Sequence, residues 1–282
     1  MHFEGIHHVT CITGDAPGNV DFYTRVLGLR LVKKTVNQDD PTVYHLFYAD
    51  EDGTPGSDIT FFEYPGARAG RAGAGMIHTV VWRVGSDEAV EFWRSRVGSV
   101  PFVDLDGLRH DLVVSAVPDA PLIADHPEIP REFALLGFEG VRAYGEEPTE
   151  FLEALGFESG LTRGDSRQGW ISYEPAPAEP PIAGAGTVHH VAWACEMGEQ
   201  DAWIDRVAAA GGRPTPVIDR CWFLSIYFRE PTGVLFEIAT KGPGFAADED
   251  PAHLGEALIL PPNFEHLREK VEPLLTPLPK TR

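Results

Sequence analysis

The chain has 282 residues, of which 43% are hydrophobic, and it contains 29 glycines and 24 prolines. This composition is typical of a globular, β-rich protein with many turns and one large core or two ordinary ones. Lysine and arginine total 23 against 43 aspartates and glutamates, which gives a formal net charge of −20 at pH 7. Such a charge opposes binding to phosphate backbones and anionic lipids, so we expect neither a nucleic-acid nor a membrane partner.

The three cysteines, Cys11, Cys195 and Cys221, form no Cys-x-x-Cys pair. This argues against a disulfide framework or a thiolate zinc site and suits a reducing compartment. The chain shows no signal-peptide pattern at its start and no apolar stretch of membrane-spanning length. We therefore expect a cytoplasmic protein.

A first βαβββ module is predicted over residues 1–70. Residues 4–13 have the pattern of a strand, and residues 15–27 space their apolar side chains at helical intervals before Gly28 ends the helix. Turn signals separate the three strands that follow, which are predicted at 30–36, 43–49 and 57–63.

The same order of elements restarts twice. Module two, residues 76–137, has a strand at 76–84, a helix at 86–96 and strands near 101–104, 108–110 and 111–117. Module three, residues 138–175, is shorter, with a strand at 140–144, a helix at 149–155 and strands around 159–163 and 169–173. Each is predicted from the same periodicities as module one.

A proline-rich segment at 174–181 is predicted to be a stiff linker, because proline cannot donate to a sheet ladder. Module four follows at 187–245, and residues 246–282 form a C-terminal tail. The fold class is therefore α+β, with four βαβββ modules that form two open β-barrels. The acidic run at 248–250 is predicted to be solvated.

Two near-copies of one phrase begin modules one and four, Gly5-Ile6-His7-His8-Val9 and Thr187-Val188-His189-His190-Val191. Both modules also end in Phe-Glu, at Glu63 and Glu237. Histidine and carboxylate in matching places are what two related modules need to share one metal. Strand alternation turns one histidine of each pair inward, but it does not decide which one.

Glu237 is the strongest single indication of a metal ligand, because its strand is otherwise apolar and a buried carboxylate needs a cation or a partner. Arg220 and Tyr227 are expected near the barrel mouth, although spacing alone predicts a solvated turn charge and an ordinary strand aromatic. The histidines outside the two pairs that we expect to be ordinary core or surface residues are His78, His110, His126, His253 and His266.

Longer phrases give the chain a resemblance to a known family. They are Gly5-Ile6-His7-His8-Val9-Thr10, residues 22–37, Asp40-Pro41-x-x-Tyr44-His45-Leu46, residues 55–62, 125–130 and 188–192, and the tail phrases at 244–249 and 254–262. Together they make the sequence similar to the vicinal oxygen chelate (glyoxalase/bleomycin resistance/dioxygenase) superfamily. Within it, the chain resembles the ring-cleaving dioxygenases that open hydroquinones.

The resemblance implies that His8, His190 and Glu237 bind Fe(II), and that Arg220, Tyr227, His7 and His189 form the surrounding pocket. It implies that modules one and four form the metal barrel, that modules two and three form the partner barrel, and that two copies form a homodimer. Two imidazoles and one carboxylate leave about three positions open on iron, enough for an oxygen of a hydroquinone or catechol and for O2. No glycine-rich dinucleotide motif is present, so no nicotinamide or flavin is expected.

Two other functions stay open. If Glu63 were a fourth ligand, the site would resemble glyoxalase I, in which a divalent Lewis acid serves an isomerase or lyase reaction. A non-catalytic protein that binds an aromatic drug is the third hypothesis, and the paired histidines and Glu237 count against it because such a binder needs no metal.

Overall fold

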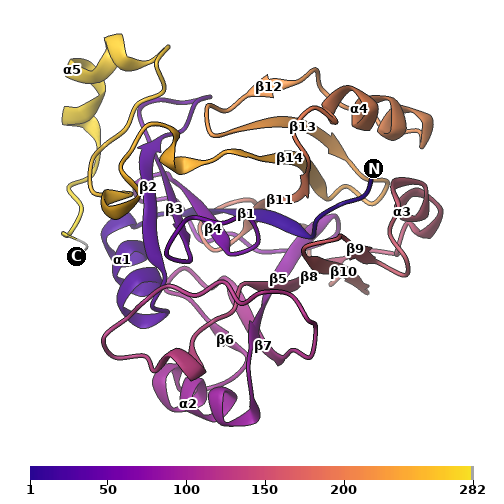
Figure 1. The fold of residues 1–282 in the computed structure, drawn as a ribbon, viewed down its shortest axis with the longest axis horizontal. Helices are drawn as coiled ribbons and strands as arrows, with labels where there is room; N and C mark the ends of the chain where they lie inside the picture. The colour runs from indigo at the N-terminus through magenta and orange to yellow at the C-terminus, as the bar shows by residue number, and fades with distance from the viewer. Residues whose placement is uncertain (281–282) are drawn as a thin grey trace.

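The computed structural model describes residues 1–280 and contains two sheets with helices around them (Figure 1). The larger sheet has eight strands in the order β12-β13-β14-β11-β1-β4-β3-β2 and curls into an open half-barrel. Its strands are β1 (Ile6–Thr13), β2 (Arg30–Val36), β3 (Tyr44–Ala49), β4 (Asp58–Glu63), β11 (Val188–Cys195), β12 (Ile218–Asp219), β13 (Phe223–Arg229) and β14 (Leu235–Pro243).

The smaller sheet has six strands in the order β6-β7-β5-β8-β10-β9. They are β5 (Met76–Val84), β6 (Phe102–Val103), β7 (Arg109–Val114), β8 (Phe138–Tyr144), β9 (Leu161–Arg163) and β10 (Gln168–Glu174). The larger sheet thus takes its strands from both ends of the chain and the smaller sheet from the middle, as the colours of Figure 1 show. The α+β class is confirmed, with two sheets of which the larger is a curled half-barrel.

The helices are short. They are α1 (Ala16–Asp21), α2 (Asp87–Val97), α3 (Thr149–Leu155), α4 (Gln200–Ala209) and α5 (Arg268–Val271), with 3-10 turns at Arg131–Phe133, Phe245–Ala247, Pro251–His253, Glu265–Leu267 and Glu272–Leu274. Ser86 caps α2 by accepting a hydrogen bond from Ala89 N, and Gly98 ends the helix in the left-handed region. In the described part of the chain, no helix has the length and apolar content needed to cross a bilayer.

Two predicted elements are wrong in detail. The helix predicted over 15–27 is α1 followed by a π-helix at Phe22–Val26, in which Leu27 N bonds Phe22 O, five residues back. The separate strands predicted at 108–110 and 111–117 are one strand, β7, because no turn interrupts its pairing with β5 between His110 and Asp111. Module two therefore has two strands after its helix, as module three does.

The C-terminal tail packs against the larger sheet next to its edge strand β2. Ile259 N donates to Lys34 O over 2.9 Å. The buried ammonium of Lys33 pairs with Asp248 over 2.7 Å and with Glu249. The prediction of a solvated acidic run is therefore wrong for Glu249, whose side chain is only 6% exposed. Since an unpaired buried ammonium would be costly, the acidic tail residues make it possible for Lys33 to lie inside.

A buried polar chain joins the two sheets. Trp82 Nε1 donates to His110 Nδ1 over 3.1 Å, which leaves His110 Nε2 to donate to the Tyr23 hydroxyl, 2.9 Å away. That hydroxyl donates in turn to Asp104 Oδ2 over 2.9 Å. Burial lowers the pKa of His110 to about 3 and raises that of Asp104 to about 6. Every member of the chain is satisfied, which is what makes the burial of these groups tolerable.

Replacing Tyr23 with Phe removes the centre of this chain and leaves His110 Nε2 and Asp104 Oδ2 without their partner. We expect Tyr23→Phe to lower the free energy of unfolding by roughly 2–4 kcal/mol, because each orphaned buried group carries its own desolvation cost. Tyr48→Phe is the matched control, since Tyr48 makes one hydrogen bond, to Asn19, and should cost about 1–2 kcal/mol. Urea unfolding measures both, and equal losses would contradict the prediction.

Candidate metal centre

Three buried side chains, His8, His190 and Glu237, meet inside the curve of the larger sheet. His8 Nε2 lies 3.2 Å from His190 Nε2 and 3.1 Å from Glu237 Oε2. His190 Nε2 lies 2.8 Å from the same carboxylate oxygen. Two imidazoles and one carboxylate at one point form a donor set that can hold a divalent first-row metal.

The strand register brings these residues together from distant parts of the chain. β1 and β11 are antiparallel, with His8 opposite Ala192 and Thr10 opposite His190. β14 is parallel to β11, with Glu237 beside Ala192. Paired positions share a face and side chains alternate along a strand, so both histidines and the glutamate point the same way. The structure thus turns the second histidine of each pair toward the others, a choice that alternation alone leaves open.

His7 fixes the orientation and tautomer of His8. Its Nε2 donates to the carbonyl oxygen of Thr240 over 3.1 Å, so its Nδ1 is an acceptor. His8 Nδ1 lies 2.9 Å away and donates to it, which leaves His8 Nε2 with a free lone pair. Burial, and then His8, lower the pKa of His7 to about 3, so the ring is neutral. This is the outer support that metal-binding histidines commonly have.

The second pair repeats the contact between the rings. His189 Nδ1 lies 2.7 Å from His190 Nδ1, which is the same geometry as in the first pair. The two copies differ in exposure, because His7 is buried whereas His189 is exposed and lines a cavity. With its Nδ1 engaged as the acceptor, His189 can offer Nε2–H to a molecule in that cavity.

The hydrogen bonds and charge of Glu237 show whether the cluster can accept a cation. Its Oε1 accepts a hydrogen bond from Ser225 Oγ over 2.5 Å, but its buried Oε2 receives none. Although burial raises the pKa of Glu237, positive charge and N–H donation at His8 and His190 hold it well below the usual value, so a positive charge at this point keeps the carboxylate ionised. An ionised oxygen and two imidazole lone pairs within about 3 Å of one another repel unless a cation lies between them. The donor set therefore fits a divalent metal.

Glu63 does not belong to this cluster. Its side chain is 2% exposed, Thr276 of the tail donates to its Oε1 over 2.7 Å, and burial raises its pKa. The prediction that Glu63 mirrors Glu237 is wrong. β1 and β4 are parallel with Thr10 beside Thr60, whereas β11 and β14 have Ala192 beside Glu237.

Since Thr10 follows His8 by two residues, as Ala192 follows His190, the position that mirrors Glu237 is Thr60. A threonine hydroxyl therefore stands where a fourth carboxylate ligand would lie. Thr60 is fully buried, and its hydroxyl donates to Thr10 Oγ1 over 2.8 Å.

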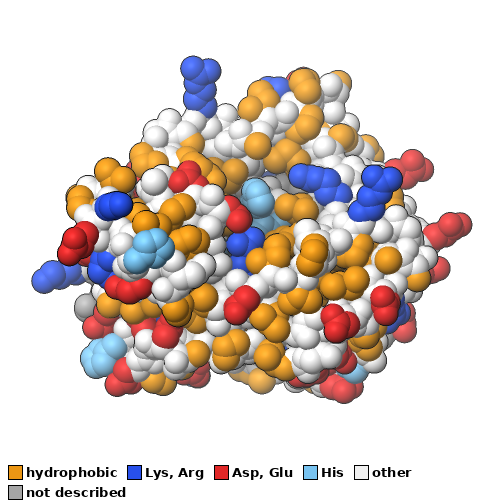
Figure 2. All heavy atoms as spheres, turned by 90° about the horizontal axis from the view of Figure 1, so that it is seen from above, with side chains coloured by type: hydrophobic (Ala, Val, Ile, Leu, Met, Phe, Trp, Pro, Cys, Tyr) orange, Lys and Arg blue, Asp and Glu red, His pale blue; other side chains and the backbone are white. Residues whose placement is uncertain are grey.

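A cavity of about 390 Å³ opens onto the cluster. Figure 2 shows the molecule from above, with the surface hollowed near the middle of this face and histidine, basic and apolar side chains visible in the hollow. The cavity is lined by His8, His189, His190, Asn37, Gln38, Asp39, His45, Phe47, Phe62, Tyr64, Thr215, Ile218, Arg220, Trp222, Phe223, Tyr227 and Leu235. Aromatic walls with a few polar groups are typical of a site for a small organic ligand.

Arg220 and Tyr227 lie in the wall of this cavity. Arg220 Nε donates to the Tyr227 hydroxyl over 3.2 Å, and the guanidinium also pairs with Asp39 over 3.2 Å. Burial, and then Glu237, raise the pKa of Tyr227, so the phenol keeps its own proton to donate. The Arg220 side chain is 18% exposed, so the simple expectation of a solvated turn charge is wrong.

His7 is absent from the cavity lining and acts on the cluster through His8. The wall residues that sequence reasoning missed include His45, Gln38 and Phe223. His45 lies in the family phrase Tyr44-His45-Leu46, which was its only signal. Gln38 lies in the loop between β2 and β3, and Phe223 begins β13. Which way these two side chains point depends on the strand register of the folded protein, which the sequence pattern does not contain.

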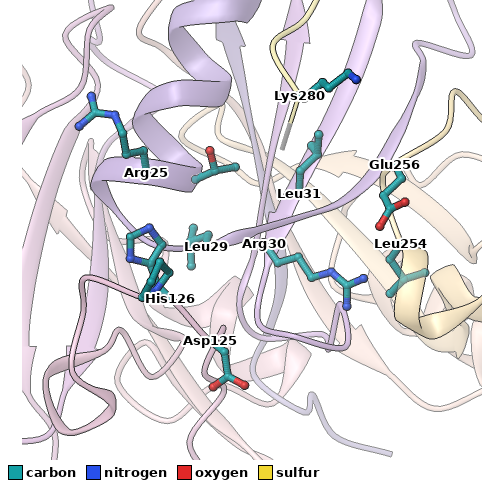
Figure 3. Close-up of a pocket in the computed structure, with 11 residues that line it drawn as sticks. Arg25, Leu29, Arg30, Leu31, Asp125, His126, Leu254, Glu256 and Lys280 are labelled. Carbon is teal, nitrogen blue, oxygen red and sulfur yellow. The ribbon is translucent and has the colours of Figure 1, made fainter. Parts of the chain in front are cut away.

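A second cavity of about 320 Å³ lies apart from the cluster, between β2, the loop at 125–127 and the tail. Figure 3 shows Arg25, Arg30 and Lys280 around it with Asp125 and Glu256. In the described part of the chain, the groups of three or more metal-ligating side chains are His8-His190-Glu237 and His2-Glu4-Asp165. Neither group lines this second cavity.

The sequence and fold have known relatives. The model of the Glyoxalase/Bleomycin resistance protein/Dioxygenase superfamily matches residues 5–99 and 134–238. The chain belongs to this superfamily. The matched segments contain His8, His190 and Glu237, together with Arg220 and Tyr227.

This superfamily member has relatives that align along nearly its whole length. It is 38% identical to "Putative ring-cleaving dioxygenase MhqO" of Bacillus subtilis, over 97% of this chain and 96% of that one. It is 32% identical to a chlorohydroquinone/hydroquinone 1,2-dioxygenase of Sphingobium indicum, over 95% and 94%. These relatives support an enzyme.

Solved structures agree on the fold. A "putative dioxygenase" from Bacillus subtilis superposes with a TM-score of 0.88 at 38% identity, covering 99% of this chain and 98% of that one. Glyoxalase I from Zea mays superposes with a TM-score of 0.55 at 16% identity, covering 84% and 92%, which shows a shared fold.

The geometry of the cluster predicts how strongly three variants of this protein bind a divalent metal. We expect Glu237→Gln to weaken binding of a divalent metal by about 100-fold or more, because a donor of the cluster is lost, and Ser225→Ala by about tenfold, because Glu237 loses its support. Glu63→Gln is the control and should bind as wild type does. Anaerobic titration with Fe(II) measures all three, and weakened binding in Glu63→Gln would contradict the assignment of Thr60 to the mirror position.

Proposed function

We propose that this chain is an Fe(II)-dependent ring-cleaving dioxygenase of the extradiol type that opens small aromatic diols, hydroquinones or catechols, with O2. The observation that carries the proposal is the convergence of two imidazole lone pairs and one ionised carboxylate oxygen, with a threonine at the fourth position, at the end of an aromatic cavity. Three protein ligands leave positions open for a substrate oxygen and O2.

In this proposal His8, His190 and Glu237 hold the iron. Iron held by these residues would supply the redox chemistry between an aromatic diol and O2. Each of these three side chains is oriented by a neighbour. Ser225 donates to Glu237 Oε1, His7 contacts His8 Nδ1, and His189 contacts His190 Nδ1. The strands of residues 1–70 and 187–245 form the metal barrel, and those of 76–175 form its partner barrel.

Tyr227 and Arg220 act on the bound diol. The Tyr227 hydroxyl accepts from Arg220, so its own proton is free to donate to the substrate oxygen that loses a proton. Arg220 donates to the other hydroxyl oxygen of the diol and orients it together with His189. His189 offers Nε2–H to the second hydroxyl oxygen and orients it. His7 is a positioning residue, because it is buried and touches His8.

The aromatic wall has a separate task. Phe47, Phe62, Trp222 and Phe223 line the cavity and cover the ring faces of a diol. They keep bulk water from the reacting atoms, which strengthens every charge interaction inside.

The names of the relatives support ring cleavage, and one of them names hydroquinone. The glyoxalase I-like alternative requires a fourth carboxylate, and Thr60 stands at that position. A drug-binding protein without catalysis has no use for three converging ligand atoms. The proposal includes a cytoplasmic location, which the three free cysteines suit, and a homodimer, which light scattering tests.

The experiment that tests the function is oxygen uptake by Fe(II)-loaded protein given methylhydroquinone. Wild type and Glu63→Gln should consume O2, and His8→Ala should lose at least about 100-fold in rate, because a ligand is missing. If no hydroquinone or catechol causes uptake while the metal is bound, the dioxygenase proposal is wrong.

Tyr227→Phe tests the hydrogen bond to the reacting oxygen. We expect kcat/KM to fall by about 10²–10³-fold, as when one preorganised donor is lost, while Fe(II) binding stays as in wild type because Tyr227 is not a ligand. Steady-state oxygen uptake and anaerobic metal titration measure the two effects. Full turnover in this variant would remove the proposed role.

A further inference from the structure

His45 lies in the cavity that opens onto the metal centre, on β3. Its ring contacts two aromatic side chains of the wall in tilted arrangements, with centroid distances of 3.9 Å to Phe47 and 4.4 Å to Phe62. These two ring contacts, together with the hydrogen bond between His45 Nε2 and Thr60, restrict rotation of the imidazole and so set the directions of its two nitrogens. The arrangement is that of a preorganised polar group in an otherwise apolar wall.

One nitrogen of His45 is already engaged. Its Nε2 lies 2.9 Å from Thr60 Oγ1, and the Thr60 hydroxyl donates to Thr10 Oγ1. Because the Thr60 proton is used, His45 Nε2 is the donor in this contact, and His45 Nδ1 carries a lone pair. Nδ1 makes no hydrogen bond to a described residue and is not among the enclosed unpartnered atoms of the described chain, so it faces the cavity.

The two halves of the larger sheet place different side chains at corresponding positions. Ser225 on β13 is opposite Ala239, two residues after Glu237, and it donates to the Glu237 carboxylate. His45 on β3 is opposite Phe62, two residues after Thr60, and it donates to the Thr60 hydroxyl. His45 is thus the counterpart of Ser225, with a bulky imidazole in place of a small hydroxyl.

The half of the sheet that contains Thr60 and His45 therefore has a different function from the half that contains Glu237 and Ser225. In one half a small serine supports a carboxylate ligand. In the other half Thr60 holds the larger imidazole of His45, which lines the cavity. Burial, and then His8 and His190, hold the pKa of His45 well below its usual value, so the ring stays an uncharged acceptor near the metal centre.

We propose that His45 is a substrate-contacting residue that accepts a hydrogen bond from the hydroxyl of the diol that does not bind the metal, and that it thereby selects diols over phenols with one hydroxyl. The inference rests on the proposed function and names a specificity residue for it. Arg220 and the His189 Nε2–H are donors, so they can satisfy the lone pairs of that hydroxyl oxygen but not its proton. His45 Nδ1 supplies the acceptor that they lack.

The test compares anaerobic binding of hydroquinone and 4-fluorophenol to the Fe(II)-loaded protein by calorimetry. Fluorine is close to hydroxyl in size but has no proton to donate. Wild type should prefer hydroquinone by at least about tenfold, the value of roughly one buried hydrogen bond. His45→Phe keeps an aromatic ring without an acceptor and should lose that preference, whereas His45→Gln should retain part of it. An unchanged preference in His45→Phe, or equal losses in both variants, would overturn the proposal.

Thr60 gives a second, independent arm. Thr60→Val removes the hydroxyl that holds the ring and should reduce the preference, whereas Thr60→Ser keeps the hydroxyl and should not. A Thr60→Val protein with the wild-type preference counts against the assigned orientation of His45. Fe(II) content and circular dichroism of each variant exclude loss of the metal or the fold as the cause.

These binding measurements need no turnover, so they test the role of His45 independently of the proposed ring cleavage. Oxygen uptake that persists while His45→Phe keeps its diol preference would reject the role of His45 and leave ring cleavage standing. A diol preference that depends on His45 in a protein without oxygen uptake would reject ring cleavage and leave a diol-binding site.

Discussion

An ionised carboxylate with one oxygen lacking any hydrogen-bond donor lies at the centre of the larger sheet. Glu237 is fully buried, and Ser225 satisfies only its Oε1. Much of the surrounding structure supplies what this group needs: two imidazoles turned with their lone pairs toward Oε2, and a second histidine behind each of them. The pairing of β1 with β11 brings these histidines together across 182 positions of sequence. The paired strands thus create, between His8, His190 and Glu237, a point at which a cation is favoured.

Local patterns in the sequence predict most of the strands and helices, because alternation and turn residues are local properties. β2, β5 and α3 begin and end where the periodicity places them. The errors arise where a local signal is ambiguous, as in the π-helix at Phe22–Val26, which uses the same apolar spacing as an α-helix. The mutual orientation of the His pairs depends on interstrand register, which pattern alone does not contain.

Glu63 shows how a sequence repeat can mislead. Both sheet halves contain Phe-Glu, and matching the letters aligns Glu63 with Glu237. The hydrogen-bonded register aligns Thr60 with Glu237 instead, and Glu63 with Thr240. Glu63 then serves the packing of the tail through Thr276. The two halves share a backbone plan but have diverged in chemistry, with a carboxylate and serine on one side and a threonine and histidine on the other.

The tail also completes the cavity wall. Lys33 lies beneath the Trp222 ring, 4.9 Å from its centroid, and Asp248 accepts from Trp222 Nε1 over 2.9 Å while it pairs with Lys33. Trp222 is therefore held in the wall by residues that follow all four modules along the chain. The position of this wall thus depends on a segment outside both sheets, so a chain shortened before Asp248 would keep every strand but lose the hydrogen bond that holds the Trp222 ring.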